Sequence, residues 1–170
     1  ALGESKYNER RAETEEALEK LQTVLPQITC LADVTPELFE ANKQVLSGKV
    51  LDRAQHVIYE CARVKESVNA LSRGDLLRFG QLLNASHMSL KDLYEVTGKE
   101  LDALSAAARA FDGCIGSRMT GAGFGGCTVS LVKSDRVEAF IKTVGAAYEK
   151  EIGYKASFYN TSIEDGAQEL

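Results

Sequence analysis

The residues that could do chemistry are concentrated in a glycine-rich run near position 120. Six of the 14 glycines lie between positions 113 and 126, and the run Thr120-Gly121-Ala122-Gly123-Phe124-Gly125-Gly126 contains the spacing G-x-G-x-x-G. Because glycine has no Cβ, the backbone N–H groups of such a loop can come close to a phosphate group or to another backbone. The hydroxyl groups of Ser117 and Thr120 would add donors. The run is therefore a candidate phosphate-binding or close-packing loop.

Two common nucleotide-binding loops are excluded by the sequence around these glycines. A dinucleotide-binding loop follows a strand and opens directly into a helix, but here the strand-like run Cys127 to Val132 follows the loop. The P-loop requires Gly-Lys-Ser/Thr, which is absent from the sequence. From spacing alone, a bulged hairpin without a ligand remains an equal alternative.

The elements that must position this loop change in character along the chain. Apolar residues at helical spacing predict helices over 5–25, from 36 to Gly48, over 54–71 and over 76–94. A fifth helix is predicted from Thr97 to about Phe111. The expected N-terminal caps are Thr35 before Pro36, Asp75, Ser134, and a capping box of Thr97 with Glu100. The first two-thirds of the chain is therefore predicted to be a helical array.

The last third is predicted to alternate strands and a helix. Cys114 to Met119 and Cys127 to Val132 have the short β-type pattern, and their near-absence of charge predicts a largely buried hairpin. A helix from Ser134 to Gly153 and a strand within Lys155 to Ile163 follow. This order predicts an α+β fold with an antiparallel sheet. Three strands are few for this many helices, so a further partner strand is expected.

Composition limits the class of protein. The 170 residues are 44% hydrophobic and 26% charged, which is typical of one globular domain. A net charge of -5 argues against a general nucleic-acid binder, and no run of 18 apolar residues suggests a membrane span. The four cysteines lack C-x-x-C spacing and the two histidines are far apart, so no zinc site is expected. Buried free thiols in a reducing cytoplasm are the simplest interpretation.

The glycine loop also carries a resemblance to a known family. Ser117-Arg118-Met119-Thr120 and the glycines through Cys127-Thr128-Val129 resemble the third signature motif of the kinases that include galactokinase, homoserine kinase, mevalonate kinase and phosphomevalonate kinase, and most closely that of the galactokinase family. The resemblance runs from about residue 5 to the end. Its other parts are Tyr7-Asn8-Glu9-Arg10-Arg11, Arg53-Ala54-Gln55-His56-Val57 with Glu60, Ser86-His87-Met88-Ser89-Leu90, Tyr94-Glu95-Val96 with Glu100-Leu101-Asp102, and Asp165-Gly166-Ala167.

The resemblance implies a partial protein and a fold. It suggests that residues 1–170 are the C-terminal domain of a two-domain sugar kinase, a helical array packed on an antiparallel sheet of three to four strands in a ferredoxin-like sandwich. The family's ATP-binding N-terminal domain, with its Gly-Leu-Ser-Ser-Ser loop and catalytic Asp and Arg, has no counterpart in this sequence. The chain by itself is therefore expected to be inactive, to supply no catalytic residue and no metal ligand, and to bind neither Mg²⁺ nor ATP tightly.

The resemblance also implies an activity and the roles of several residues. The full-length enzyme would transfer the γ-phosphoryl group of ATP, with Mg²⁺, to the 1-hydroxyl of galactose in the cytoplasm, without a nucleic-acid or membrane partner. Tyr7 would contact the sugar. Ser117, Thr120, Gly121, Gly123, Gly125 and Gly126 would support the phosphate loop of the other domain. An N-acetylgalactosamine kinase, a non-catalytic galactose sensor and an independent helical interaction module remain alternatives.

Three polar positions have predictions of their own. Arg118 is the only charge between residues 113 and 132, so it requires either a carboxylate partner or an exposed edge. His87 is expected to be a hydrogen-bonded core histidine. His56 and Glu60 are four apart on a helix and are expected to pair.

Overall fold

The computed structural model describes residues 2–162 and contains six α-helices and one β-hairpin within them. The stretch Asp165-Gly166-Ala167 lies outside the described residues. The helices and strands, in chain order, are α1 (Leu2–Gln22), α2 (Pro36–Asn42), α3 (Gly48–Ser72), α4 (Leu76–Ser89), α5 (Lys99–Ala110), β1 (Cys114–Thr120), β2 (Cys127–Val132) and α6 (Val137–Ile152). The predicted α+β class is confirmed. Among the described residues, no helix is both long enough and apolar enough to span a membrane.

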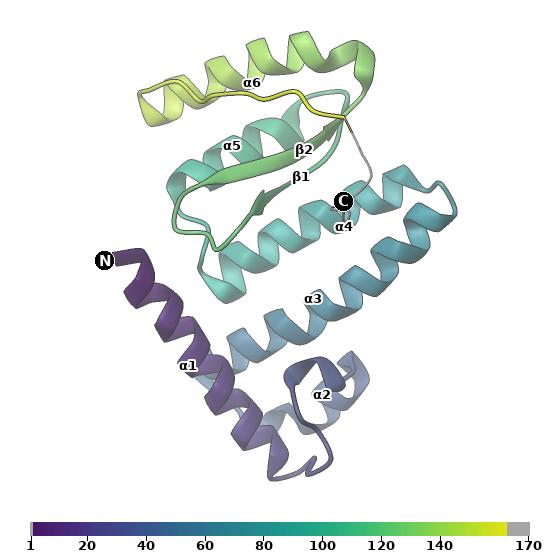
Figure 1. Ribbon diagram of the computed structural model, residues 1–170, viewed down its shortest axis with the longest axis vertical. Helices are drawn as coiled ribbons and strands as arrows, with labels where there is room; N and C mark the ends of the chain where they lie inside the picture. The colour runs from purple at the N-terminus through teal and green to yellow at the C-terminus, as the bar shows by residue number, and fades with distance from the viewer. Residues whose placement is uncertain (1, 163–170) are drawn as a thin grey trace, which may run out of the picture.

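The N-terminal helices share one apolar core. The stripe on α1 packs against α3, and α2, which lies below α3 in Figure 1, also packs against α3. The centre of this core is fully buried and includes Leu21 from α1, Phe39 from α2 and Ile58 from α3. Because these residues lie at helical spacing on three separate elements, their burial fixes α1 across one end of α3. This placement determines where the first residues of α1 lie.

Two of the four predicted N-terminal caps, at Thr35 and Asp75, are present. The Thr35 hydroxyl accepts from the Leu38 N–H at 3.2 Å, and the Asp75 carboxylate accepts from the Arg78 N–H at 3.0 Å. The cap predicted at Ser134 is wrong, because Ser134 begins a short 3₁₀ turn and α6 starts at Val137 without a side-chain cap bond. The capping box predicted for α5 is wrong, because Gly98 occupies the N-cap without a side-chain bond. Gly48 was also expected to end the second helix, but that helix stops at Asn42 and Gly48 begins α3.

The hairpin has the predicted strands and packs on two helices. β1 pairs with β2 in antiparallel register, with Ser117 opposite Ser130, and it contacts α4 and α5 (Figure 1). The outer edge of β1 is closed by α4, since the Ser117 N–H donates to Asn84 Oδ1 at 2.9 Å and the Met119 N–H donates to His87 Nδ1 at 3.0 Å. These side chains take the place of a neighbouring strand at this edge.

The prediction of a largely buried hairpin holds for β1 but not for β2. The side chain of Val129 on β2 is 49% exposed. A hollow of about 1010 Å³ lies between β2, α6 and the chain that follows α6. The unpaired side of β2 is thus uncovered by any element of the described residues.

The strand predicted within Lys155 to Ile163 is wrong for the described part of that segment. Residues 155–162 form no strand and run alongside α6 (Figure 1). They are held by packing, with the Phe158 ring edge-on to Phe140 at a centroid distance of 6.3 Å. A strand needs a hydrogen-bonded neighbour, and the hollow separates this segment from β2. The described sheet therefore has two strands, fewer than the expected three to four.

Candidate functional site

A pocket of about 270 Å³ forms where three distant parts of the chain meet. One wall is the first half of α1, the second is a turn after α4, and the third is the end of β1 with the glycine loop (Figure 1). The residues that line it are Tyr7, Arg10, Arg11, Thr14, Leu90, Tyr94, Val96, Met119, Gly121, Ala122 and Phe124. The structure thus brings Tyr7 and the glycine loop, which are more than 100 residues apart in the sequence, to the same pocket.

The α1 wall presents one face of the helix. Tyr7, Arg10, Arg11 and Thr14 follow the i, i+3, i+4, i+7 spacing of a single helical face. Tyr7 is 55% exposed, so its ring and hydroxyl are accessible from solvent. Arg10 is buried and pairs with Glu13 and, at 3.3 Å, with Glu9, while its Nε is buried without a partner. This wall therefore offers an exposed aromatic ring with a hydroxyl and the exposed Arg11 guanidinium, which pairs with Glu15 at 2.9 Å.

The second wall is a local departure from regular helix. Leu90–Tyr94 forms a π-helical turn, and the next residue, Glu95, has the left-handed φ of 54°. The Val96 N–H then donates back to the Leu90 carbonyl at 3.1 Å, which closes the turn. A π-turn and a left-handed non-glycine residue in sequence are uncommon and are often found at functional sites. The turn places Tyr94 and Val96 in the pocket.

The imidazole ring of His56 stacks on the Tyr94 ring. The two rings stack at a centroid distance of 4.5 Å and an interplanar angle of 27°, and His56 Nδ1 lies 2.8 Å from the Ser89 hydroxyl. The predicted pair between His56 and Glu60 is not formed as a hydrogen bond. Glu60 instead accepts from Ser86 and, at 2.6 Å, from Arg63. Burial lowers the pKa of His56 to about 4, so the imidazole is neutral at physiological pH.

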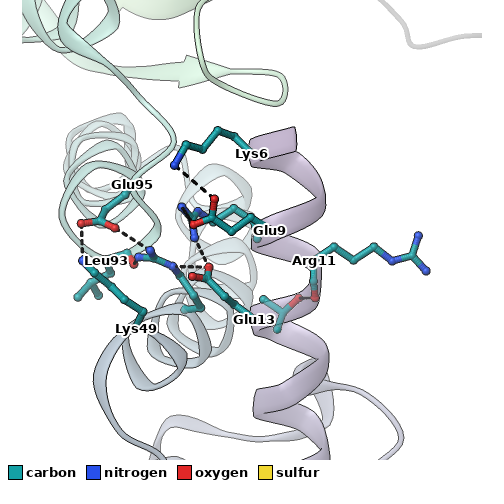
Figure 2. A network of polar contacts seen from close by, with 10 residues as sticks. Lys6, Glu9, Arg11, Glu13, Lys49, Leu93 and Glu95 are labelled. Atoms are coloured by element: carbon teal, nitrogen blue, oxygen red, sulfur yellow. Dashed lines mark hydrogen bonds and ion pairs between the residues drawn. The ribbon is translucent and has the colours of Figure 1, made fainter. Parts of the chain in front are cut away.

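A network of ion pairs joins the first two walls (Figure 2). Arg53 of α3 bonds to Glu13 of α1 at 2.8 Å and to Glu95 of the turn at 2.6 Å, and Lys49 also bonds to Glu95 at 2.5 Å. The hydrogen bonds from Lys49 and then from Arg53 lower the pKa of Glu95 to about 2. Burial raises the pKa of Glu13, but the bonds from Arg53 and Arg10 outweigh it and leave this pKa lowered. Both carboxylates are therefore ionised at neutral pH.

The glycine loop is docked on the second wall through its backbone. The Phe124 N–H donates to the Val96 carbonyl at 2.7 Å. At Gly123, where φ is +84°, a Cβ would lie 2.1 Å from the same carbonyl oxygen. Only a residue without a side chain permits this approach. The predicted loop residues therefore differ in role, because Gly123 permits close packing on the turn and Gly121 lines the pocket.

The remaining predicted loop residues lie in other surroundings. Ser117 is fully buried, and its hydroxyl accepts from Ser130 at 2.8 Å. Thr120 is exposed at the end of β1. Gly125 and Gly126 line the larger hollow beside β2. Of the predicted set, the structure places Tyr7 and Gly121 on the pocket itself.

His87 and Arg118 have the partners that the sequence required. His87 Nδ1 accepts from the Met119 N–H, and its Nε2 lies 3.1 Å from Asp102, which confirms a hydrogen-bonded core histidine. Burial lowers the pKa of His87, although Asp102 acts in the opposite direction. Arg118 forms an ion pair with Glu60 at 3.3 Å. Both residues stabilise the strand that leads into the loop.

Several residues of the site were not predicted from the sequence. Helical spacing from Tyr7 contained the signal for Arg10, Arg11 and Thr14. Tyr94 and Val96 belong to a stretch that resembles the family, but the sequence did not place them in the pocket, because that place depends on the π-turn. Among the described residues, no group of three or more His, Cys, Asp or Glu side chains could hold a metal ion. The exposed donors on the pocket lining are the Tyr7 hydroxyl and the Arg11 guanidinium.

Comparison with known proteins gives one consistent family. Residues 67–150 match the family model "GHMP kinases C terminal". The chain is 52% identical to the galactokinase of Lactococcus lactis subsp. cremoris, over 100% of this chain and 43% of that protein. It is 52% identical to the galactokinase of Clostridium acetobutylicum, over 99% of this chain and 43% of that protein.

A solved structure agrees with these relatives. The crystal structure of Lactococcus lactis galactokinase complexed with galactose superposes with a TM-score of 0.90 at 53% identity, and covers 94% of this chain and 41% of that one. The chain thus spans less than half the length of the curated relatives it matches. It belongs to the GHMP kinase family and corresponds to the C-terminal part of its galactokinase members.

Proposed function

We propose that this chain forms one wall of the sugar site of a galactokinase, which transfers the γ-phosphoryl group of ATP to the 1-hydroxyl of galactose. The observation that carries the proposal is the meeting of Tyr7 with the glycine loop in one pocket. The pocket offers an exposed phenol ring and hydroxyl next to an apolar floor of Tyr94, Val96 and Phe124. A sugar needs both features, because it presents hydroxyl groups at its edge and apolar C–H groups on its face.

The role of the chain would be binding and orientation. Phosphoryl transfer depends mainly on positioning and on charge stabilisation, and a cleft between two domains suits it. In this proposal the Tyr7 hydroxyl donates to a sugar oxygen or its ring packs on the sugar, and the loop shapes the cleft and packs against the phosphate-binding segment. Ser117, Thr120, Gly125 and Gly126 would act through the shape of the loop.

ATP and Mg²⁺ would be held elsewhere in the full-length protein. The described residues do not fit a metal site, since no cluster of suitable side chains occurs among them. We propose that residues 1–170 are the C-terminal domain of a two-domain kinase, and that the ATP-binding domain lies outside this sequence. The share of the relatives that the chain covers, 43%, supports this division.

The hollow beside β2 supports a larger sheet in the full-length protein. It runs between β2 and the chain after α6 and leaves the outer side of β2 unpaired. A further strand in this hollow would extend the sheet to the three to four strands of a ferredoxin-like sandwich. We also propose a cytoplasmic location, which suits four cysteines that are all free thiols. The expectation that these thiols are buried is wrong for Cys30 and Cys127, which are exposed.

The test is the activity of the full-length protein that carries this sequence. Galactose should be phosphorylated in an ATP-dependent reaction. Replacing Tyr7→Phe should raise the KM for galactose by about 2- to 10-fold, the value of one neutral hydrogen bond. Tyr159→Phe is the matched control, because Tyr159 is 87% exposed and lies away from the pocket, and it should leave the KM unchanged.

Each alternative function has its own outcome in this assay. Faster phosphorylation of N-acetylgalactosamine than of galactose would identify the sibling kinase. Binding of ATP and galactose without phosphoryl transfer would identify a sensor. Isolated residues 1–170 are expected to show no ATP-dependent phosphorylation of galactose, and a rate above background would contradict the division into domains.

A further inference from the structure

The two walls of the pocket that face the glycine loop are joined by a single buried side chain. Arg53 lies in α3, and only 1% of its side chain is exposed. Its three nitrogen atoms bond in three directions, from Nε to Glu13, from Nη1 to the Leu93 carbonyl, and from Nη2 to Glu95. Figure 2 shows Glu13 on α1 and, across the network, Leu93 and Glu95 on the turn.

The contacts of Arg53 act on the residues that shape the pocket. Glu13 lies on α1 three residues after Arg10, about one helical turn further along the helix that carries Tyr7. It also accepts a hydrogen bond from Arg10. Glu95 holds the left-handed conformation, with φ of 54°, which costs free energy in a residue with a side chain. The next carbonyl, that of Val96, accepts the Phe124 N–H of the glycine loop at 2.7 Å. A chain of direct contacts therefore runs from Arg53 to all three walls.

Only arginine can make this set of bonds. A guanidinium group is planar and presents its donors in a fixed fork, whereas a lysine ammonium is a point donor on a flexible stem. Lys49 illustrates the difference, because it also bonds to Glu95 but its side chain is 56% exposed and no bond to Glu13 or Leu93 accompanies this contact in the described structure. Lys49 can neutralise Glu95, but it does not connect the turn to α1.

We propose that Arg53 is a positioning residue of the sugar pocket: it ties the helix that carries Tyr7 to the left-handed turn on which the glycine loop docks. It does not touch the ligand and acts through Glu13, Leu93 and Glu95. The role in sugar binding rests on the proposed function, whereas the role in docking the loop stands on the contacts of this chain alone.

The first test is hydrogen exchange on residues 1–170. In Arg53→Lys, the amides of Val96 and Phe124 should exchange about tenfold faster or more, relative to amides of α6, because the bonds that fix the turn are lost. Measuring relative to α6 separates loosening of the pocket from a loss of overall stability. Lys49→Met is the matched control, since it removes one exposed contact to Glu95 and keeps Arg53. In this variant the exchange rates of the Val96 and Phe124 amides should stay within about threefold of those in the unmodified chain.

The second test uses the full-length protein and the same two variants. Arg53→Lys should raise the KM for galactose by about tenfold, with a smaller effect on kcat, and Lys49→Met should not. The proposal is overturned if Arg53→Lys leaves Val96 and Phe124 as protected as before, or if α6 loosens equally. Faster exchange at both amides in a protein that does not use galactose would uphold the positioning role and contradict only the proposed function.

Discussion

Replacing Gly123→Ala tests the docking of the glycine loop most directly. The new Cβ would lie 2.1 Å from the Val96 carbonyl oxygen, so loop and turn must separate by about 1 Å to reach an ordinary contact. That movement breaks the 2.7 Å bond from the Phe124 N–H to the same oxygen. The bond is worth about 1 kcal/mol, and the left-handed φ of +84° costs an alanine about 1 to 2 kcal/mol.

Gly121→Ala is the matched control in the same loop. Its φ is +86°, nearly the same, but a Cβ there meets no atom within 4 Å. The control should therefore carry the backbone cost and none of the collision. With about 1 to 3 kcal/mol for overpacking, Gly123→Ala should be less stable than Gly121→Ala by about 2 kcal/mol.

Chemical and thermal unfolding of residues 1–170 would measure this difference. For a domain of this size, 2 kcal/mol corresponds to a Tm lower by about 4 to 8 °C. The loop could instead detach from the turn, which would lower the free energy of unfolding by less. Hydrogen exchange would detect this outcome, because the Phe124 amide would then lose its protection. Equal stability of the two variants, with the Phe124 amide still protected in Gly123→Ala, would refute the proposed docking.

Three further expectations concern the fold. Gly80→Ala should lower the free energy of unfolding, measured in urea, by about 3 kcal/mol or more, because its Cβ would lie 1.9 Å from the Ile115 carbonyl oxygen. A loss under about 1 kcal/mol would show that α4 and β1 separate easily. Phe39→Ala should cost about 3 to 5 kcal/mol in the same assay, since Phe39 is fully buried between α2 and α3. His56 keeps its proton in the unfolded chain below about pH 6.5 but in the folded chain only below about 4, so stability should fall as the pH is lowered through this window, by up to about 3 kcal/mol. Because burial also lowers the pKa of His87, the test is the slope of stability against pH from unfolding curves between pH 7 and pH 5. His56→Gln should reduce this slope, and an unchanged slope would show that His56 is not buried in its neutral form.

The strengths and errors of the sequence predictions have a common physical origin. The hairpin strands and the caps at Thr35 and Asp75 were predicted correctly, because strand pattern and capping depend on neighbouring residues. The capping box at Thr97 failed because the chain uses a glycine with φ of 83° to begin α5 one residue later. The strand after Lys155 failed because a strand requires a partner, and none lies beside that segment in the described residues.

The candidate site divides in the same way. From the sequence alone came the glycine loop, the order of elements that excludes a dinucleotide site, and the candidacy of Tyr7, through a resemblance that the relatives confirm at the level of the family. The shared pocket of Tyr7 and the loop, and the bonds of Arg53 between the walls, became visible in the folded chain. Glu13, Arg53 and Glu95 are about 40 residues apart in succession, and no local pattern encodes such contacts. They arise because burial of the apolar faces of α1 and α3 brings these charges together, where each must find a partner.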